Sequence, residues 1–157
     1  IARMRGGEHR PIDLTSWIAN VRTRWLPQVA EAGRSAEFTA PDSEVVVLSL
    51  EVLDEICDVL IDNALAHGRG HIAVAVSGGS GALALTVADE GTLAREPSEL
   101  FVRHDPRAAG TGVGLALARS LAEGEGGRLV VASSTPTEFR LVVADDSARA
   151  HPEPAES

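Results

Sequence analysis

Apolar residues recur at helical spacing in three segments of the chain. In the first segment Asp13 is placed to cap a helix, and Pro27 is expected to bend or shorten its last turns. The apolar face of this helix is formed by Leu14, Trp17, Ile18, Val21, Trp25 and Val29. A second helix is predicted over about residues 51–67, where Gly68 ends it, and a third over about residues 113–123.

Alternation of apolar residues with small or polar ones predicts the strands, which are expected over residues 36–39, 45–48, 72–76, 83–87, 128–132 and 138–143. The two middle strands form a hairpin around the glycine-rich turn at residues 78–81. No period is visible between Gly91 and Gly112, which indicates a long loop of the kind that serves as a lid or is disordered. We therefore predict an α+β two-layer sandwich, in which three helices cover one face of a single mixed, mostly antiparallel sheet.

The length of 157 residues and the 44% share of hydrophobic residues fit one globular domain. We expect this domain over residues 11–144, with residues 1–10 as the end of an upstream segment and residues 145–157 as a disordered tail. No apolar run approaches the ~20 residues that cross a bilayer. Because the chain begins at Ile1, we expect a cytoplasmic piece of a longer protein, which could itself be anchored in the membrane.

The net charge and the cysteine content exclude some partners and some kinds of covalent cross-link. The net charge of −9 repels a phosphate backbone and argues against nucleic acid as the main partner. The single cysteine, Cys57, excludes an internal disulfide, and its spacing from Leu53 and Leu60 predicts a core position. Because the net charge is negative, an anionic ligand would need a site whose local groups attract it.

The glycines at positions 110, 112 and 114 run directly into the third predicted helix. Glycine lets the backbone approach a bulky anion, and the first turn of a helix offers unpaired N–H groups to phosphate. Glycine-rich turns before helices are also common without a ligand. On its own, the segment is a candidate phosphate cradle or a plain turn.

Two polar residues stand at the ends of predicted elements. Asn63 lies at the edge of the apolar stripe of the second helix, where its amide oxygen could bind Mg²⁺ or simply bond a neighbouring loop. Asp89 ends the predicted hairpin in Asp89-Glu90-Gly91, where its carboxylate could accept the amine of adenine or form part of a turn.

In this order and spacing, these segments resemble the nucleotide-binding boxes of sensor histidine kinases. The matching parts are Asn63 with residues 64–67, Asp89-Glu90-Gly91, Leu100-Phe101, and the glycine segment with the helix after it. These kinases belong to the superfamily of gyrase, chaperone, histidine-kinase and MutL ATPases. The resemblance extends over residues 11–143 and implies a Bergerat-type fold with a long ATP lid, binding ATP and Mg²⁺.

The resemblance implies a role for each matching residue. Asn63 would bind the Mg²⁺ that bridges the ATP phosphates, Asp89 would accept the adenine amine, and Gly91 would let the adenine lie against the backbone. Phe101 would anchor the lid to the domain. The lid end that faces the phosphates would consist of Gly110, Thr111, Gly112, Val113, Gly114 and Leu115.

Three side chains of the loop could meet the γ-phosphate, or else be solvated. Arg103 is the first choice, because the family often has a basic residue two positions after the matching phenylalanine. Arg107 and His104 are the other candidates. Asn63 and Arg103 are thus the expected catalytic residues.

Two positions depart from the family pattern. Leu93 stands where a second glycine is usual, and Ala66 stands where many members have a lysine or arginine. His67 is a candidate to replace that phosphate contact, with a core or capping role as the alternative. These departures leave a degenerate nucleotide-binding interaction module as one alternative function.

One further position distinguishes the members of the superfamily. Gyrase-type ATPases and anti-sigma-factor serine kinases typically have a glutamate one turn before the asparagine, and this chain has Val59, which cannot take a proton. The resemblance therefore favours a histidine kinase, with a serine kinase of the anti-sigma type as the other alternative. None of the five histidines has the His-Glu-x-Arg-Thr-Pro surroundings of an acceptor. The acceptor is expected on a dimerisation domain, in the same full-length chain or a separate polypeptide, and a response regulator is expected next.

Overall fold

The computed structural model describes residues 8–93, 96–101 and 112–147. Seven strands and four helices follow one another along these residues. Their order is β1 (His9–Asp13), α1 (Leu14–Glu31), β2 (Ala36–Thr39), β3 (Val45–Ser49), α2 (Leu50–His67), β4 (Ile72–Ser77), β5 (Ala82–Ala88), α3 (Pro97–Leu100), α4 (Gly112–Gly124), β6 (Arg128–Ser134) and β7 (Thr137–Ala144).

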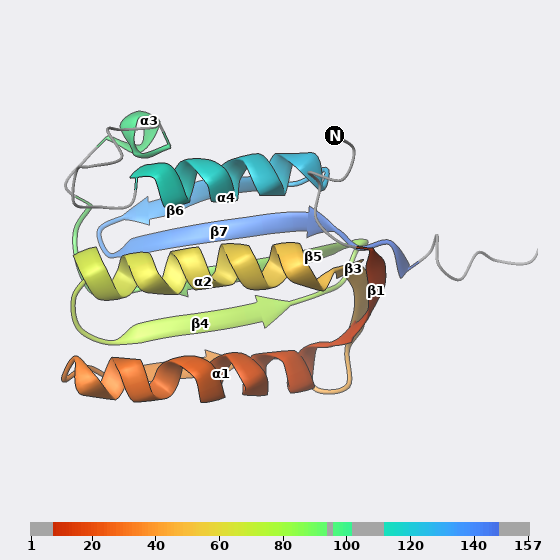
Figure 1. Cartoon of the computed structure of the whole chain (residues 1–157), viewed down its shortest axis with the longest axis horizontal. Helices are drawn as coiled ribbons and strands as arrows, with labels where there is room; N and C mark the ends of the chain where they lie inside the picture. The colour runs from red at the N-terminus through yellow and green to blue at the C-terminus, as the bar shows by residue number, and fades with distance from the viewer. Residues whose placement is uncertain (1–7, 94–95, 102–111, 148–157) are drawn as a thin grey trace, which may run out of the picture.

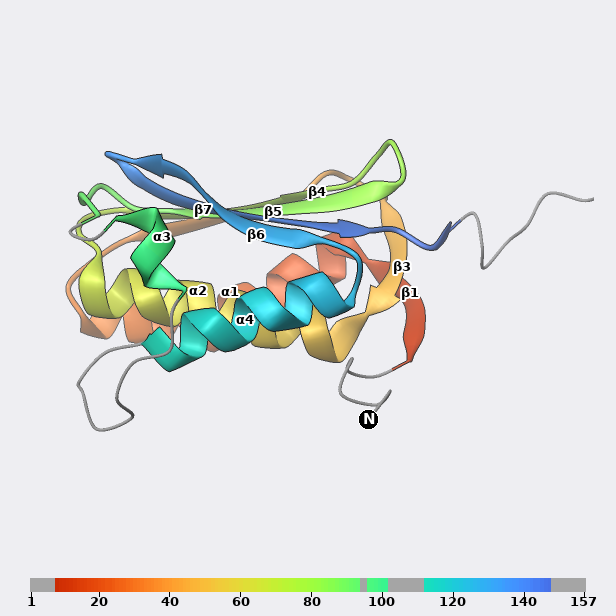
Figure 2. The same ribbon diagram turned by 90° about the horizontal axis from the view of Figure 1, so that it is seen from above.

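Five strands form the main sheet in the order β2-β4-β5-β7-β6. Only the β2–β4 pair is parallel, and the other three pairs are antiparallel. The helices α1, α2 and α4 lie side by side on one face of this sheet, with α2 in the middle (Figures 1 and 2). The predicted two-layer α+β sandwich with a mixed, mostly antiparallel sheet is therefore confirmed.

The two longest helices start at polar caps and are joined by polar contacts. The Asp13 side chain caps α1 through the N–H of Thr15, and the Ser49 side chain caps α2. Both tryptophan indoles of α1 donate hydrogen bonds to aspartates of α2, from Trp17 to Asp54 at 2.8 Å and from Trp25 to Asp58 at 2.9 Å. Each bond satisfies the indole N–H of a tryptophan whose ring is otherwise buried in the core.

The core lies between the helices and the inner face of the sheet. The predicted apolar stripe of α1 is buried throughout, and Cys57 is fully buried as expected. α1 also continues to Glu31, four residues past Pro27, so the expected shortening of the helix is wrong. Val29, which is fully buried, explains the continuation, because ending the helix earlier would remove this side chain from the core.

Strands β1 and β3 form a separate two-stranded antiparallel sheet. The prediction of one sheet, with β3 as a member and no strand before the first helix, is therefore wrong. β1 escapes a pattern search because only Ile12 of its five residues is buried, and Pro11 is tolerated because this short strand has a free edge. Among the described residues, β1 thus starts two residues before the expected domain boundary at residue 11.

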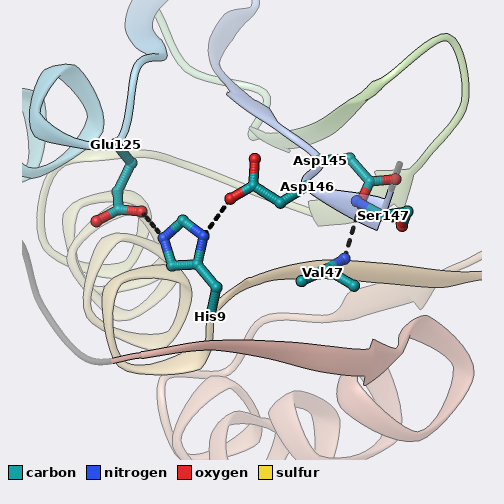
Figure 3. A network of polar contacts seen from close by, with 6 residues as sticks. All are labelled: His9, Val47, Glu125, Asp145, Asp146 and Ser147. Atoms are coloured by element: carbon teal, nitrogen blue, oxygen red, sulfur yellow. Dashed lines mark hydrogen bonds and ion pairs between the residues drawn. The ribbon is translucent and has the colours of Figure 1, made fainter. Parts of the chain in front are cut away.

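Residues 145–147, the first residues of the predicted tail, contact the domain. The Asp145 carboxylate accepts the N–H of Val47 at 2.8 Å, and the N–H of Asp146 donates to the carbonyl of Val47 at 2.8 Å. The imidazole of His9 lies between the carboxylates of Asp146 and Glu125 (Figure 3).

None of the helices in the described part of the chain has the length and apolar character of a membrane span.

Candidate functional site

The end of α2, the end of β5 and the start of α4 meet at one end of the molecule, opposite β1 and β3 (Figure 1). α2 carries Asn63 there, and β5 is followed directly by Asp89. Asn63 is 7% exposed and Asp89 is 6% exposed. Few polar side chains are buried among the described residues, and Asn63 and Asp89 are two of them. Burying a polar side chain is unfavourable unless it makes specific contacts, so both positions are candidates for a functional role.

Asn63 lies one turn after Val59 on the same side of α2. One turn earlier in α2, Val59 lies beneath the first turn of α4, where a Cβ built on Gly114 would be 3.7 Å from Val59 Cγ1. The glycine-rich start of α4 is therefore within about one helical turn of Asn63. A helix start has unpaired N–H groups and a partial positive charge, so this arrangement suits an anion whose metal ion is bound by an amide oxygen.

Asp89 is held by backbone groups on both sides. Its Oδ1 accepts the N–H of Gly91 at 2.7 Å and the N–H of Arg69 at 3.3 Å. The Gly68 backbone lies directly against the same carboxylate, leaving no room for a Cβ at that position. A carboxylate has about four acceptor positions, so these two bonds leave capacity for a ligand amine.

Gly91 is fixed in turn by Thr137, the first residue of β7. The carbonyl of Gly91 accepts the Thr137 N–H at 3.0 Å and the Thr137 hydroxyl at 3.2 Å, while the Thr137 carbonyl accepts the N–H of Asp89. Our sequence reasoning missed Thr137. The signal was present, because it is the one polar member of the inward-facing series Thr137, Phe139, Leu141 and Val143.

The two departures from the family pattern have different surroundings. Leu93 packs against the core, and its N–H donates to the carbonyl of Ser134 at 2.9 Å. Ala66 and His67 are both exposed at the end of α2. A core position for His67 is therefore wrong, since the side chain is the exposed basic group of the last helical turn.

Phe101, which follows α3 directly, packs against the rest of the domain. Its ring meets the Phe139 ring edge-on, with centroids 6.4 Å apart and planes at 88°. The guanidinium carbon of Arg119 in α4 lies 5.0 Å from the centroid of the Phe101 ring. Both contacts are of the favourable kind for aromatic rings, so Phe101 is held to the sheet and to α4.

The glycine segment is only partly within the described residues. Arg103, Arg107, Gly110 and Thr111 lie outside them, as does His104. Gly112 and Gly114 lie in the first turn of α4. Leu115 is 1% exposed, so its side chain belongs to the core and only its backbone could face a ligand.

Comparisons with known proteins agree with this geometry. The family model described as "Histidine kinase-, DNA gyrase B-, and HSP90-like ATPase" matches residues 50–147, which is more than half of the chain. The histidine kinase AdeS of Acinetobacter baumannii is 18% identical with a TM-score of 0.76, over 89% of this chain and 68% of AdeS. The nucleotide-free catalytic domain of the histidine kinase ThkA is 15% identical with a TM-score of 0.73, over 88% of this chain and 97% of ThkA.

A third similar structure was solved with a nucleotide analogue. Full-length ShkA in complex with AMPPNP is 20% identical with a TM-score of 0.74, over 92% of this chain and 34% of ShkA. At these identities the superpositions show a shared fold. The family match covers residues 50–147, which include Asn63, the Asp89 turn and the glycine-rich start of α4. The chain therefore belongs to the family of histidine kinase-, DNA gyrase B- and HSP90-like ATPases.

Proposed function

We propose that this chain is the ATP-binding catalytic domain of a sensor histidine kinase. The bond between the γ-phosphorus of ATP and its bridging oxygen would break, ADP would leave, and an imidazole nitrogen would receive the phosphoryl group. The acceptor histidine would lie on a dimerisation domain, in the same full-length protein or on a separate polypeptide. An aspartate of a response regulator would then take the phosphoryl group.

The observation that carries this choice is Val59. Its side chain lies beneath the start of α4, one turn before Asn63, where a hydrolytic member or a serine kinase of the superfamily would need a glutamate. Valine cannot remove a proton from water or from a hydroxyl group. A neutral imidazole has its own lone pair and needs no such base, so this site suits histidine as the acceptor.

The residues around the site would bind and orient the nucleotide. Asn63 would hold the Mg²⁺, which neutralises charge on the phosphates, and the start of α4 would bind the triphosphate through its backbone. Asp89 would accept the adenine amine, while the N–H groups of Gly91 and Arg69 keep its carboxylate in place. Arg103 remains the proposed contact of the γ-phosphate, with Arg107 and Gly110 in the lid.

The expected setting follows from the same assignment. ATP and response regulators occur in the cytoplasm, so we place the domain there. The net charge of −9 gives no attraction for nucleic acid or for an anionic membrane surface. Partners of this domain would therefore be ATP, the histidine-bearing domain and the regulator.

Calorimetric titration with AMPPNP, with and without Mg²⁺, tests the nucleotide site. Binding should depend on Mg²⁺ and should be much weaker for the guanine analogue. Asn63→Ala should remove the Mg²⁺ dependence, and Asp89→Asn should weaken binding by about 1–3 kcal/mol through loss of a charged acceptor. Matched controls are Asn20→Ala on the exposed face of α1 and Asp42→Asn in a surface turn, both of which should bind as the wild type does.

The outcomes separate the alternative functions. Leu93 and Ala66 are the reason to consider a degenerate nucleotide-binding interaction module. That alternative is supported if the wild-type chain does not bind AMPPNP with Mg²⁺. If the chain binds AMPPNP, labelled ATP and a histidine-bearing dimerisation domain should yield acid-labile phosphate on that domain. Acid-stable phosphoserine on a protein target would instead establish a serine kinase of the anti-sigma type.

A further inference from the structure

Arg34 occupies an unusual position between α1 and β2. Its side chain is half-buried, and its guanidinium donates three hydrogen bonds to backbone carbonyls. Nε bonds Gly70 at 2.9 Å, while Nη1 bonds Ala64 at 2.9 Å and Leu65 at 3.3 Å. No carboxylate pairs with Arg34 among the contacts of the described residues, so its role differs from that of the surface arginines in ion pairs.

The three carbonyls belong to the two sides of one turn. Ala64 and Leu65 are in the last turn of α2, where a positive charge is favourable, and the Ala64 carbonyl also accepts the N–H of Gly68 at 2.9 Å. Gly70 is on the far side of the turn, before β4, and its φ of +69° is one that side-chain-bearing residues rarely adopt. The planar guanidinium therefore ties the end of α2 to the segment that enters β4.

This turn forms one wall around Asp89. Between the tied points, Gly68 lies against the carboxylate and the N–H of Arg69 donates to its Oδ1. The carbonyl of Arg69 also accepts the N–H of Glu90 at 2.8 Å. Arg34 thus reaches Asp89 through the backbone of residues 68–70, without touching it.

We propose that Arg34 is a positioning residue that sets the adenine selectivity of this site by holding the turn at residues 68–70 against Asp89. The inference rests on the proposed function, in which Asp89 accepts the adenine amine. Asn63 should depend less on Arg34, because it lies inside α2, before the Ala64 and Leu65 carbonyls that Arg34 binds. The triphosphate end of the site should therefore be much less affected than the base end.

The test uses two ligands that differ only in the adenine amine, namely ATP and purine riboside triphosphate, which are competed against a fluorescent ATP analogue with Mg²⁺. In the wild type, loss of the amine should weaken binding roughly tenfold, which is the size of one charged hydrogen bond. In Arg34→Met, ATP should bind roughly five- to tenfold more weakly, and the difference between the two ligands should shrink to about twofold. Arg34→Lys should recover part of the difference, and Arg140→Met, which changes an exposed arginine of β7, should leave it intact.

Amide hydrogen exchange adds a readout that needs no ligand. The N–H groups of Arg69 and Gly91 should exchange faster in Arg34→Met, with the centre of α2 unchanged. If Arg34→Met does not fold, Arg34→Lys carries both measurements. If the wild type does not bind ATP, the proposed function fails, while the exchange data still decide the positioning role. If the wild type binds ATP, and the variants keep the same ligand difference and the same exchange, Arg34 is not a positioning residue.

Discussion

The backbone of Gly68 lies directly against the carboxylate of Asp89, with no space between them for a methyl group. The φ of Gly68 is −89°, which any residue can adopt, so glycine is needed here for space. A Cβ would overlap Oδ2 and Cγ of Asp89 and would come within 2.7 Å of the Ala64 carbonyl oxygen. The position of Asp89 therefore depends on a residue that provides no functional group.

Gly68→Ala should displace the Asp89 carboxylate and weaken AMPPNP binding at least tenfold, with about 1–3 kcal/mol lost from the free energy of unfolding. Calorimetric titration and urea denaturation measure the two effects. The control is Gly126→Ala, where no atom lies within 4 Å of the new methyl group. The φ of +78° at Gly126 costs this control about 1 kcal/mol of stability, and its affinity for AMPPNP should not change. Equal affinities in both variants would show that the contact does not fix Asp89.

Phe101 should contribute to both stability and binding, because its ring connects the end of α3 with β7 and α4. Phe101→Ala should lower the free energy of unfolding by about 1–3 kcal/mol, less than for a fully buried phenylalanine. It should also weaken AMPPNP binding, since the proposed lid begins directly after this residue. Phe38→Ala on the edge strand β2 is the matched control, because Phe38 is also partly buried against the core but lies outside the site. A similar loss of stability without a difference in binding would contradict the anchoring role.

The stability of the domain should depend on the protonation of His9. Its Nε2 lies 2.6 Å from Glu125 Oε1, and its Nδ1 bonds the carboxylate of Asp146, so only the doubly protonated ring can donate both bonds (Figure 3). Burial alone would lower the pKa of His9, but the bonds and charges of Asp146 and Glu125 outweigh it and raise the pKa above 6.5. The resulting stability is fully present below about pH 6.5 and is lost as the pH rises through the higher folded-state pKa.

Urea denaturation between pH 6 and pH 9 measures this effect of His9. The wild type should lose up to about 1 kcal/mol over the range, a small amount because the ring is one-third exposed. His9→Gln should remove this loss, and Asp146→Asn should reduce it. Asn20→Ala, on the exposed face of α1, should leave it unchanged. An identical pH dependence in His9→Gln would exclude the network as its source.

Cys57 should report on global unfolding. Its side chain is fully buried in α2, and burial, with a smaller contribution from the charge of Asp58, raises the pKa of the thiol far above its ordinary value. Thiolate is the reactive form, so the native protein should not react with a disulfide reagent at pH 8, while the urea-unfolded protein should react completely. Rapid reaction of the native chain would show that this part of the core opens locally.

The sequence predicted elements best where one local pattern governs them. α1, α2, α4 and the β4–β5 hairpin have regular apolar periods, because each buries one face against the same core. β1 and the short α3 have no such period, since β1 lies at an edge and α3 is a four-residue helix that begins at Pro97 within a loop. The separate pairing of β1 with β3 also has no local signature, because strand pairing is decided between segments far apart in the chain.

For the site, the sequence by itself determined the residue types that could bind ATP. Asn63, Asp89 and the glycine segment are identified because their spacing matches that of a family. Each of them can be recognised from a short local motif in the sequence. Tertiary structure decided what holds these groups in place. For the Asp89 turn, Thr137 and Gly68, together with the proposed positioning residue Arg34, act through backbone carbonyls and close packing, which leave no pattern in the sequence around them. Their contacts exist only once α2, β5 and β7 have been brought together by burial of the shared core.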